Sequence, residues 1–175
     1  MSEELTLPDY LAPGLDIVFV GLNPGTYSAR RSHYYARPGN LFWGALYEAG
    51  LTPVRLEPEE DCRVLEFGLG LTDLVQRATD QAAQIAPTEW QAGGVALAAK
   101  IERYRPRIVC FNGLAGYRRA FDPSARPGRQ ERRLGEALAF IVPSTSGLNA
   151  AYSHAERIAW FRRLRLLRDE ERRKA

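Results

Sequence analysis

The sequence predicts an α/β domain built as a three-layer sandwich, with a central, mainly parallel sheet flanked by helices. Three apolar segments, 15–21, 107–112 and 137–142, have the composition of strands buried on both faces. Segments with helical spacing alternate with these strands, a pattern typical of parallel sheets. The 175 residues are 45% hydrophobic and 26% charged, so we expect one folded domain over residues 1–175.

The first part of the chain is predicted as strand, loop, helix and connector. The strand 15–21 is an apolar run that leads into the loop Asn23-Pro24-Gly25. A helix is expected over 40–49, where apolar residues recur at helical spacing before Gly50 ends it. Residues 57–61 are acidic and contain a proline, which indicates a connector between elements.

The middle of the chain is predicted to contain two strands and two helices. The segment 64–71 is short, apolar and contains glycines, which indicates a bent strand. A helix over 91–104 is expected to end before Pro106. The strand 107–112 then leads into a short helix near 115–120.

The last part of the chain is predicted as a strand, a polar loop and a long helix. The strand 137–142 ends at the loop 143–147. Ser153 can cap the final helix, because Glu156 stands three residues later as in a capping box. We expect the last residues, 169–175, to fray. The apolar residues predicted to face inward are Ile158, Phe161, Leu164 and Leu167.

Composition excludes several classes of protein. The cysteines, Cys62 and Cys110, and the histidines, His33 and His154, match no metal-ligand spacing, so we expect neither a metal nor another cofactor. No apolar run approaches the roughly 18 residues that a membrane span needs. Residues 1–4 are acidic and lack the pattern of a signal peptide. We therefore expect a cytoplasmic protein that does not bind membranes.

The basic residues are almost all arginine. Of the 24 basic residues, 22 are arginine, although the net charge is only +3. Arginine forms bidentate contacts with phosphate, which suits a nucleic-acid surface, but a GC-rich genome produces the same enrichment. Charge alone therefore leaves both interpretations open. One segment is especially basic, with Arg118, Arg119, Arg126, Arg129, Arg132 and Arg133.

Three loops that follow predicted strands are the best candidates for a functional site, because ligands bind beyond the carboxyl ends of parallel strands. These loops are 21–40, 68–77 and 143–150. The glycine, proline and asparagine of 21–25 suit a polar ligand, although an ordinary tight turn has the same composition. No lysine of a phosphate-binding loop follows, and Gly68-Leu69-Gly70 lacks the third glycine of a dinucleotide motif.

Aromatic and basic residues alternate between 27 and 43, as in surfaces that stack on bases. Within this segment Phe42 and Trp43 are expected in the core, whereas Tyr34 and Tyr35 are better candidates for solvent or ligand. In the loop 143–149, hydroxyl groups surround a single leucine, Leu148. This leucine either wedges between stacked bases or folds back beneath the loop.

Asp73 is the one carboxylate in an apolar stretch after a predicted strand. A carboxylate in this position can act as a base or stabilise a developing cation. It can equally cap the next helix, which is the simpler interpretation from these residues alone.

Five motifs in this order give the chain a resemblance to the mismatch-specific uracil-DNA glycosylase and thymine-DNA glycosylase family, within the uracil-DNA glycosylase superfamily. The resemblance covers residues 14–165 and implies that family's α/β fold in a single domain. The motifs are Gly21-Leu22-Asn23-Pro24-Gly25, Arg37-Pro38-Gly39-Asn40-Leu41-Phe42-Trp43, Gln91-Ala92-Gly93-Gly94, Phe111-Asn112-Gly113 and Pro143-Ser144-Thr145-Ser146-Gly147-Leu148.

The resemblance implies a base excision repair enzyme. It would act on double-stranded DNA with a uracil–guanine mismatch, flip the uracil out and hydrolyse its N-glycosidic bond with water, leaving an abasic site. No cofactor is implied, and a monomer is expected.

The resemblance also assigns roles to particular residues. Asn23 matches the asparagine that positions the attacking water, Tyr35 the aromatic that stacks on the flipped base, and Ser28 the small residue at the C5 edge of the base. The expected base pocket comprises Leu22, Gly25, Ser28, Tyr35 and Asn40. Leu148 matches the wedge and Ser144 a serine that grips phosphate; the expected DNA-binding residues are Ser144, Ser146, Gly147, Leu148 and Asn149.

The chain departs from the family pattern at two places. Asp73 stands where relatives carry lysine or asparagine, so we expect it to contribute to catalysis beside Asn23. Asn149-Ala150 replaces the Ser-Arg pair of bacterial relatives, which weakens the case for reading the opposite guanine. Three alternatives stay open: a glycosylase for uracil in any context, a non-catalytic nucleic-acid-binding domain with an arginine-rich surface, and an enzyme for free nucleotides. The missing phosphate-loop lysine argues against the last of these.

Overall fold

The computed structural model describes residues 4–175, so most of the acidic start of the chain, Met1–Glu3, lies outside the described residues. A five-stranded sheet with the order β2-β1-β3-β5-β4 forms the centre. Its first four strands in this order are parallel, and the short β4 runs antiparallel to β5. The predicted α/β class with a mainly parallel sheet is confirmed. The strands are β1 Ile17–Gly21, β2 Leu69–Asp73, β3 Ile108–Asn112, β4 Gly128–Arg129 and β5 Leu138–Val142.

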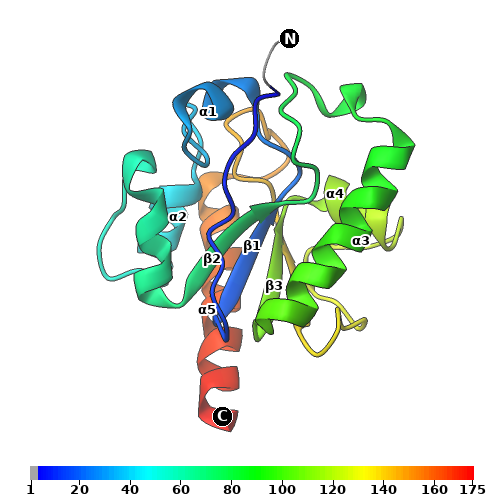
Figure 1. The fold of residues 1–175 in the computed structure, drawn as a ribbon. Coiled ribbons are helices and arrows are strands. Elements are labelled where there is room, and N and C mark those ends of the chain that lie inside the picture. The colour runs from blue at the N-terminus through cyan, green and yellow to red at the C-terminus, as the bar shows by residue number, and fades with distance from the viewer. Residues whose placement is uncertain (1–3) are drawn as a thin grey trace.

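Helices cover both faces of this sheet (Figure 1). One face packs against α2 and α5, and the other packs against α3 and α4. The three layers that the sequence predicts are therefore present. The helices are α1 Thr26–Arg31, α2 Phe42–Glu48, α3 Pro87–Tyr104, α4 Leu114–Ala120 and α5 His154–Lys174, with 3-10 segments η1 Pro58–Phe67 and η2 Ala82–Gln84.

The central strand β1 shows why its sequence is apolar throughout. Ile17 and Phe19 belong to the core on the α2 and α5 side, whereas Val18 and Val20 belong to the core on the α3 and α4 side. Side chains alternate between the faces of a strand, so a strand covered on both faces needs apolar residues at every position. The strands β3 and β5 follow the same rule.

The segment from 57 to 71 differs from the prediction. Residues 57–61 are not a connector, and the strand does not begin at 64, because Pro58–Phe67 forms the 3-10 segment η1. Glu60 accepts a hydrogen bond from the backbone N–H of Glu57, and Pro58 occupies the first helical turn. Acidic residues and proline are favoured in the first turn of a helix, where they satisfy or remove free N–H groups. Gly68, with φ of 73°, then ends the segment immediately before β2.

The helices α1 and α3 also depart from the prediction. The short helix α1 was not predicted, because Thr26–Arg31 has no apolar period and only Ser28 and Ala29 are buried. The helix α3 begins at Pro87 rather than at Gln91, since Glu89 accepts a hydrogen bond from the N–H of Ala86 at 2.8 Å. Short helices and helix beginnings depend on such capping contacts more than on periodicity.

The final helix confirms its predicted cap and buried face. Ser153 Oγ accepts a hydrogen bond from the N–H of Glu156 at 3.1 Å, and Glu156 accepts one from the N–H of Ser153. The four predicted core positions are all buried. The helix continues to Lys174 rather than ending earlier, and Arg172 Nη2 lies 2.6 Å from Asp16 Oδ2. This ion pair ties the expected fraying end to the start of β1.

Within residues 4–175 no helix is both long and apolar enough to cross a membrane. The described residues also contain no group of three His, Cys, Asp or Glu side chains placed to hold a metal ion. Cys62 is exposed and Cys110 is buried, and both are free thiols.

Candidate active site

The three loops that the sequence singles out begin at one edge of the sheet. Gly21 ends β1 and pairs in register with Asp73, which ends β2. Asn112 ends β3 and pairs with Val142, which ends β5. The first two loops are joined by backbone hydrogen bonds, such as Leu74 N–H to the Gly21 carbonyl at 2.8 Å. The carboxyl ends of four strands therefore form one platform, as expected for a parallel sheet.

Asp73 is buried at this edge and does not cap a helix. It is the last residue of β2, and the next helical segment, η2, has Gln81 as its N-cap, so the capping interpretation is wrong. The side chain is 5% exposed, and its Oδ2 is buried with no hydrogen-bond partner among the described residues. Burial raises the pKa of Asp73 to about 8; the charge of Asp9 adds to the rise, and Lys100 opposes it.

Tyr35 and Asp73 converge on Gly21. A Cβ atom added to Gly21 would collide with Asp73 Oδ1 and would lie 3.2 Å from Tyr35 Oη. The glycine therefore leaves room for a carboxyl and a phenol at the end of β1. The Tyr35 hydroxyl is buried without a hydrogen-bond partner among the described residues. Burial and the charge of Asp73 raise the pKa of Tyr35, and the side chain of Asn112 lowers this pKa by a smaller amount.

The backbone places Tyr35 in an unusual conformation. Its φ is 51°, in the left-handed region that few non-glycine residues adopt. The ring lies on Phe42, with centroids 4.1 Å apart, and Phe42 is fully buried as the sequence predicts. A strained residue held by packing is common at functional sites. The neighbouring Tyr34 is instead 2% exposed and donates its hydroxyl to the Pro8 carbonyl, so its predicted contact with solvent or ligand is wrong.

The amide of Asn23 has a fixed orientation. Its Nδ2 donates to the Arg77 carbonyl at 3.0 Å and to Thr79 Oγ1 at 2.8 Å. Because a carbonyl oxygen can only accept, the nitrogen must face Arg77, and the amide oxygen is left for another partner. Arg77 is itself held by Glu89, with Nε and Oε1 2.8 Å apart. The loop after β2 thus sets the direction of the Asn23 oxygen.

The other residues predicted for the base pocket mainly shape its loops. Ser28 is 8% exposed, and its Oγ accepts a hydrogen bond from the N–H of Ala36 at 3.1 Å. Asn40 Oδ1 accepts from the N–H of Phe42 at the start of α2. The Leu22 side chain points toward α4, since a Cβ on Gly116 would lie 3.3 Å from it. Leu22 can therefore offer backbone atoms to a ligand, and Gly25 is exposed immediately before α1.

Asn112 belongs to the motif Phe111-Asn112-Gly113, but the sequence alone predicts no role for it. Its side chain pairs with Thr145, donating to Oγ1 at 2.8 Å and accepting from the N–H at 3.0 Å. Thr145 is fully buried, and its carbonyl accepts from the N–H of Leu41. This network joins β3 to the loops after β1 and β5. The position of Asn112 at the end of a predicted strand was the signal that could have identified it.

Residues 143–149 form a compact turn, the Leu148 loop, with a leucine in solvent. Leu148 is 78% exposed, so it does not fold back beneath the loop. Ser144 Oγ accepts from the N–H of Ser146, and Ser146 Oγ accepts from the N–H of Leu148, each at 3.2 Å. A Cβ on Gly147 would lie 3.0 Å from the Gly39 carbonyl, so glycine permits close contact with the loop before α2.

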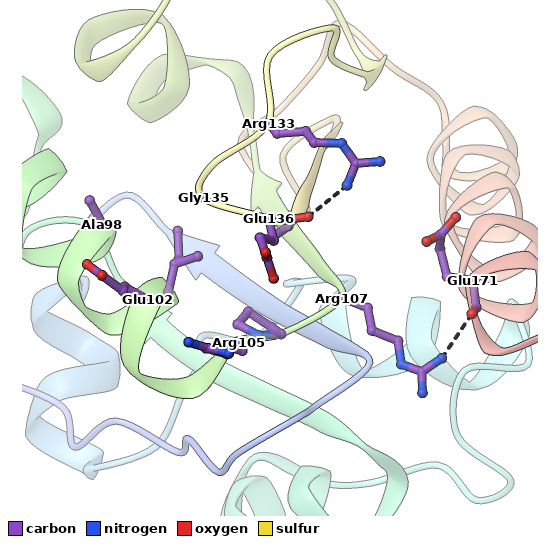
Figure 2. A pocket seen from close by; sticks show the side chains of 11 residues that line it. Ala98, Glu102, Arg105, Arg107, Arg133, Gly135, Glu136 and Glu171 are labelled. Carbon is purple, nitrogen blue, oxygen red and sulfur yellow. Dashed lines mark hydrogen bonds between the residues drawn. The ribbon is translucent and has the colours of Figure 1, made fainter. Parts of the chain in front are cut away.

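A separate cavity of about 650 Å³ lies at the opposite edge of the sheet (Figure 2). Its lining includes Arg105 and Arg107, which precede β3, and Glu136, which precedes β5. Two of its arginines form local hydrogen bonds: Arg107 donates to the Glu171 carbonyl and Arg133 to the Glu136 carbonyl. This cavity contains none of the residues that converge at the carboxyl edge, so the candidate site is the edge around Asp73.

Fold and geometry together define an α/β protein with a candidate polar site at the carboxyl ends of its strands. Residues 8–165 match the model of the Uracil DNA glycosylase superfamily, so the chain belongs to this superfamily. Membership supports a uracil-DNA glycosylase function. The fold is also similar to the solution structure of a candidate uracil DNA glycosylase from Methanosarcina acetivorans, with a TM-score of 0.60 and 22% sequence identity. That similarity covers 93% of this chain and 98% of the other.

Proposed function

We propose that this protein is a monofunctional DNA glycosylase that hydrolyses the N-glycosidic bond of uracil mispaired with guanine. The observation that carries the proposal is the buried Oδ2 of Asp73, which has no hydrogen-bond partner among the described residues, at the edge where Asn23 presents an oriented amide oxygen. A buried carboxyl oxygen without a partner costs stability, so its presence in a member of a superfamily of hydrolases favours a catalytic role.

The two side chains would divide the chemistry between them. Cleavage of the bond between sugar and base develops positive charge on the sugar, which an ionised Asp73 stabilises. The same carboxylate accepts the proton of the attacking water, whereas the amide of Asn23 can only orient that water through its oxygen. Backbone N–H groups near Leu22 and Gly25 would stabilise the negative charge of the leaving uracil. The ring of Tyr35 offers a surface on which the extruded base can stack.

The Leu148 loop would open the duplex. A uracil inside a duplex must be flipped out at a cost of a few kcal/mol, which is smallest for a mispair. The exposed Leu148 can fill the vacated position in the stack. Ser144 Oγ and Ser146 Oγ each accept a hydrogen bond within the loop, which leaves both hydroxyl hydrogens free to donate to phosphate oxygens.

Much of the arginine-rich segment has contacts within the fold. Arg118 Nε donates to the Ala125 carbonyl at 2.8 Å. The guanidinium of Arg119 lies 4.8 Å from the centre of the Trp90 ring, and that of Arg132 lies 5.3 Å from the centre of Phe121. Contacts within the fold thus account for several of these arginines without a nucleic-acid-binding surface. This favours the enzyme over the non-catalytic nucleic-acid-binding domain.

Base release under single-turnover conditions tests this function. The substrates are duplexes with U·G, U·A or T·G pairs, and single-stranded DNA that contains uracil. We expect U·G to react fastest, because the mispair lowers the cost of flipping. Equal cleavage of every uracil substrate would contradict mismatch selectivity and favour the broader glycosylase. Binding without any release would favour the non-catalytic domain.

A further inference from the structure

We propose that Arg157 is the positioning residue of the Leu148 loop, a role that rests on the proposed function. Arg157 lies in the second turn of α5, and its Nη1 donates to the Ser146 carbonyl at 3.1 Å and to the Ser144 carbonyl at 3.5 Å. Arg157 lies outside the five sequence motifs. It does not belong to the group of buried side chains around Gly21, so its effect on uracil release would pass through the loop.

The same two carbonyls receive a second pair of donors from within the loop. Asn149 Nδ2 donates to the Ser144 carbonyl at 2.9 Å, and the backbone N–H of Asn149 donates to the Ser146 carbonyl at 3.1 Å. Arg157 and Asn149 therefore both donate to the same two carbonyls. Hydrogen bonds from a charged donor are roughly twice as strong as neutral ones, and a guanidinium stays charged at every working pH. The bend that exposes Leu148 is thus fixed by a permanent charge supplied from α5.

The surroundings of Arg157 differ from those of its neighbours on α5. Arg165 and Arg168 pair with Asp169, and Arg172 pairs with Asp16. For Arg157, by contrast, no carboxylate of the described chain lies within ion-pair distance. Its Nε is also buried with no hydrogen-bond partner among residues 4–175. Arg157 is partly buried, and a buried N–H group of a cation without a partner costs stability, so its presence here indicates a role in function.

This arrangement confines the effect of Arg157 to the opening of the duplex. The guanidinium holds the base of the turn, and the leucine at its tip enters the DNA. Removing Arg157 should therefore impair flipping to the extent that Leu148 contributes to it. Removing both side chains should cost no more than the more damaging single change, because the second change acts on a function already lost.

A double-mutant cycle on a U·G duplex tests this coupling. The proteins are Arg157→Met, Leu148→Ala and the double variant, compared in single-turnover uracil release. We expect each single change to slow release by about 10-fold or more, and the double variant to be no slower than the slower single variant. Losses that multiply in the double variant would overturn the proposal, because Arg157 would then act independently of Leu148.

Arg162→Met is the matched control, since Arg162 is an exposed arginine of the same helix. It removes the same charge from α5 and should leave release unchanged. A 2-aminopurine placed beside the uracil reports flipping directly; its fluorescence rise should shrink in Arg157→Met and stay normal in Arg162→Met. An equal response of the two variants would refute a specific role for Arg157.

A second variant, Arg157→Lys, keeps the test possible if Arg157→Met does not fold. Arg157→Lys keeps the charge and an aliphatic stem but removes Nη1, the atom that donates to both carbonyls. If Arg157→Met does not fold, Arg157→Lys should show the same lack of additivity with Leu148→Ala. The failure of the proposed function has a different signature, because the wild-type protein would then release no uracil at all.

Discussion

Replacing Asp73 with asparagine should slow the enzyme and also change how its stability depends on pH. The variant keeps the shape of the side chain but cannot ionise. Loss of the general base and of the charge that stabilises the sugar cation predicts a single-turnover rate lower by about 100-fold or more. Asp80→Asn is the matched control, because Asp80 is exposed in the loop after β2.

The effect on stability follows from the pKa of Asp73, which rises from 3.8 in the unfolded chain to about 8 in the folded protein. An acid with a raised pKa binds its proton more tightly in the folded state. The contribution of Asp73 to the free energy of unfolding is therefore most favourable below pH 4 and is lost as the pH rises toward about 8. At neutral pH the carboxyl of Asp73 is ionised in the unfolded chain but protonated in the folded protein. Binding this proton costs roughly 4 kcal/mol.

Thermal or urea unfolding at several pH values checks this reasoning. Asparagine introduces an N–H₂ group whose own cost is independent of pH, so the informative quantity is the stability of the variant minus that of the wild type. This difference should increase from about pH 4 to about pH 8 and then level off. A difference that stays constant across this range would refute the assignment of a buried, protonated Asp73. Asp80→Asn should show no such trend.

Three further substitutions test the site. Gly21→Ala should destabilise the protein by about 1–3 kcal/mol in urea unfolding and abolish uracil release, because the added methyl collides with the Asp73 carboxyl; a stable, active variant would contradict the close convergence. Asn23→Ala should slow release by about 100-fold with little change in DNA affinity, measured by fluorescence anisotropy, because the amide orients water rather than DNA; lost affinity would instead give it a binding role. Leu148→Ala should leave the melting temperature unchanged, since the side chain is 78% exposed, yet slow release from duplex DNA; unchanged release from a duplex would remove the wedge.

The pH dependence of the rate offers a further check on the chemistry. If ionised Asp73 is the active form, single-turnover release from U·G should rise with pH and level off near the pKa of about 8. The direction follows from the need for a deprotonated carboxylate. A rate that stays constant from about pH 6 to about pH 9 would contradict this role.

The strands were predictable because the sheet is covered on both faces. Strands such as 15–21 must then be apolar at every position, and this pattern stands out in the sequence. The final helix was predictable from its cap, since Ser153 and Glu156 carry a local signal. The segment around 57–71 was not, because its helical structure depends on capping contacts at Pro58 and Glu60 rather than on periodicity.

The candidate site was predictable as a set of loops but not as a set of contacts. The rule that ligands bind beyond strand ends brought Asn23, Asp73 and Leu148 to one edge. It could not show that Asp73 Oδ2 is buried without a hydrogen-bond partner among the described residues, because its surroundings depend on how Asp73 and Tyr35 converge on Gly21. Nor could it show the contact of Arg157 with the Leu148 loop, because these residues meet only after α5 packs against the sheet.

The most direct test of the account is uracil release from a U·G duplex by the wild-type protein and by Asp73→Asn, measured side by side. We predict that the wild type releases free uracil and leaves an abasic site, whereas Asp73→Asn binds the same duplex but releases uracil about 100-fold more slowly. Equal rates for the two proteins would contradict the catalytic role of Asp73. The absence of release by the wild type, with DNA still bound, would contradict the glycosylase itself.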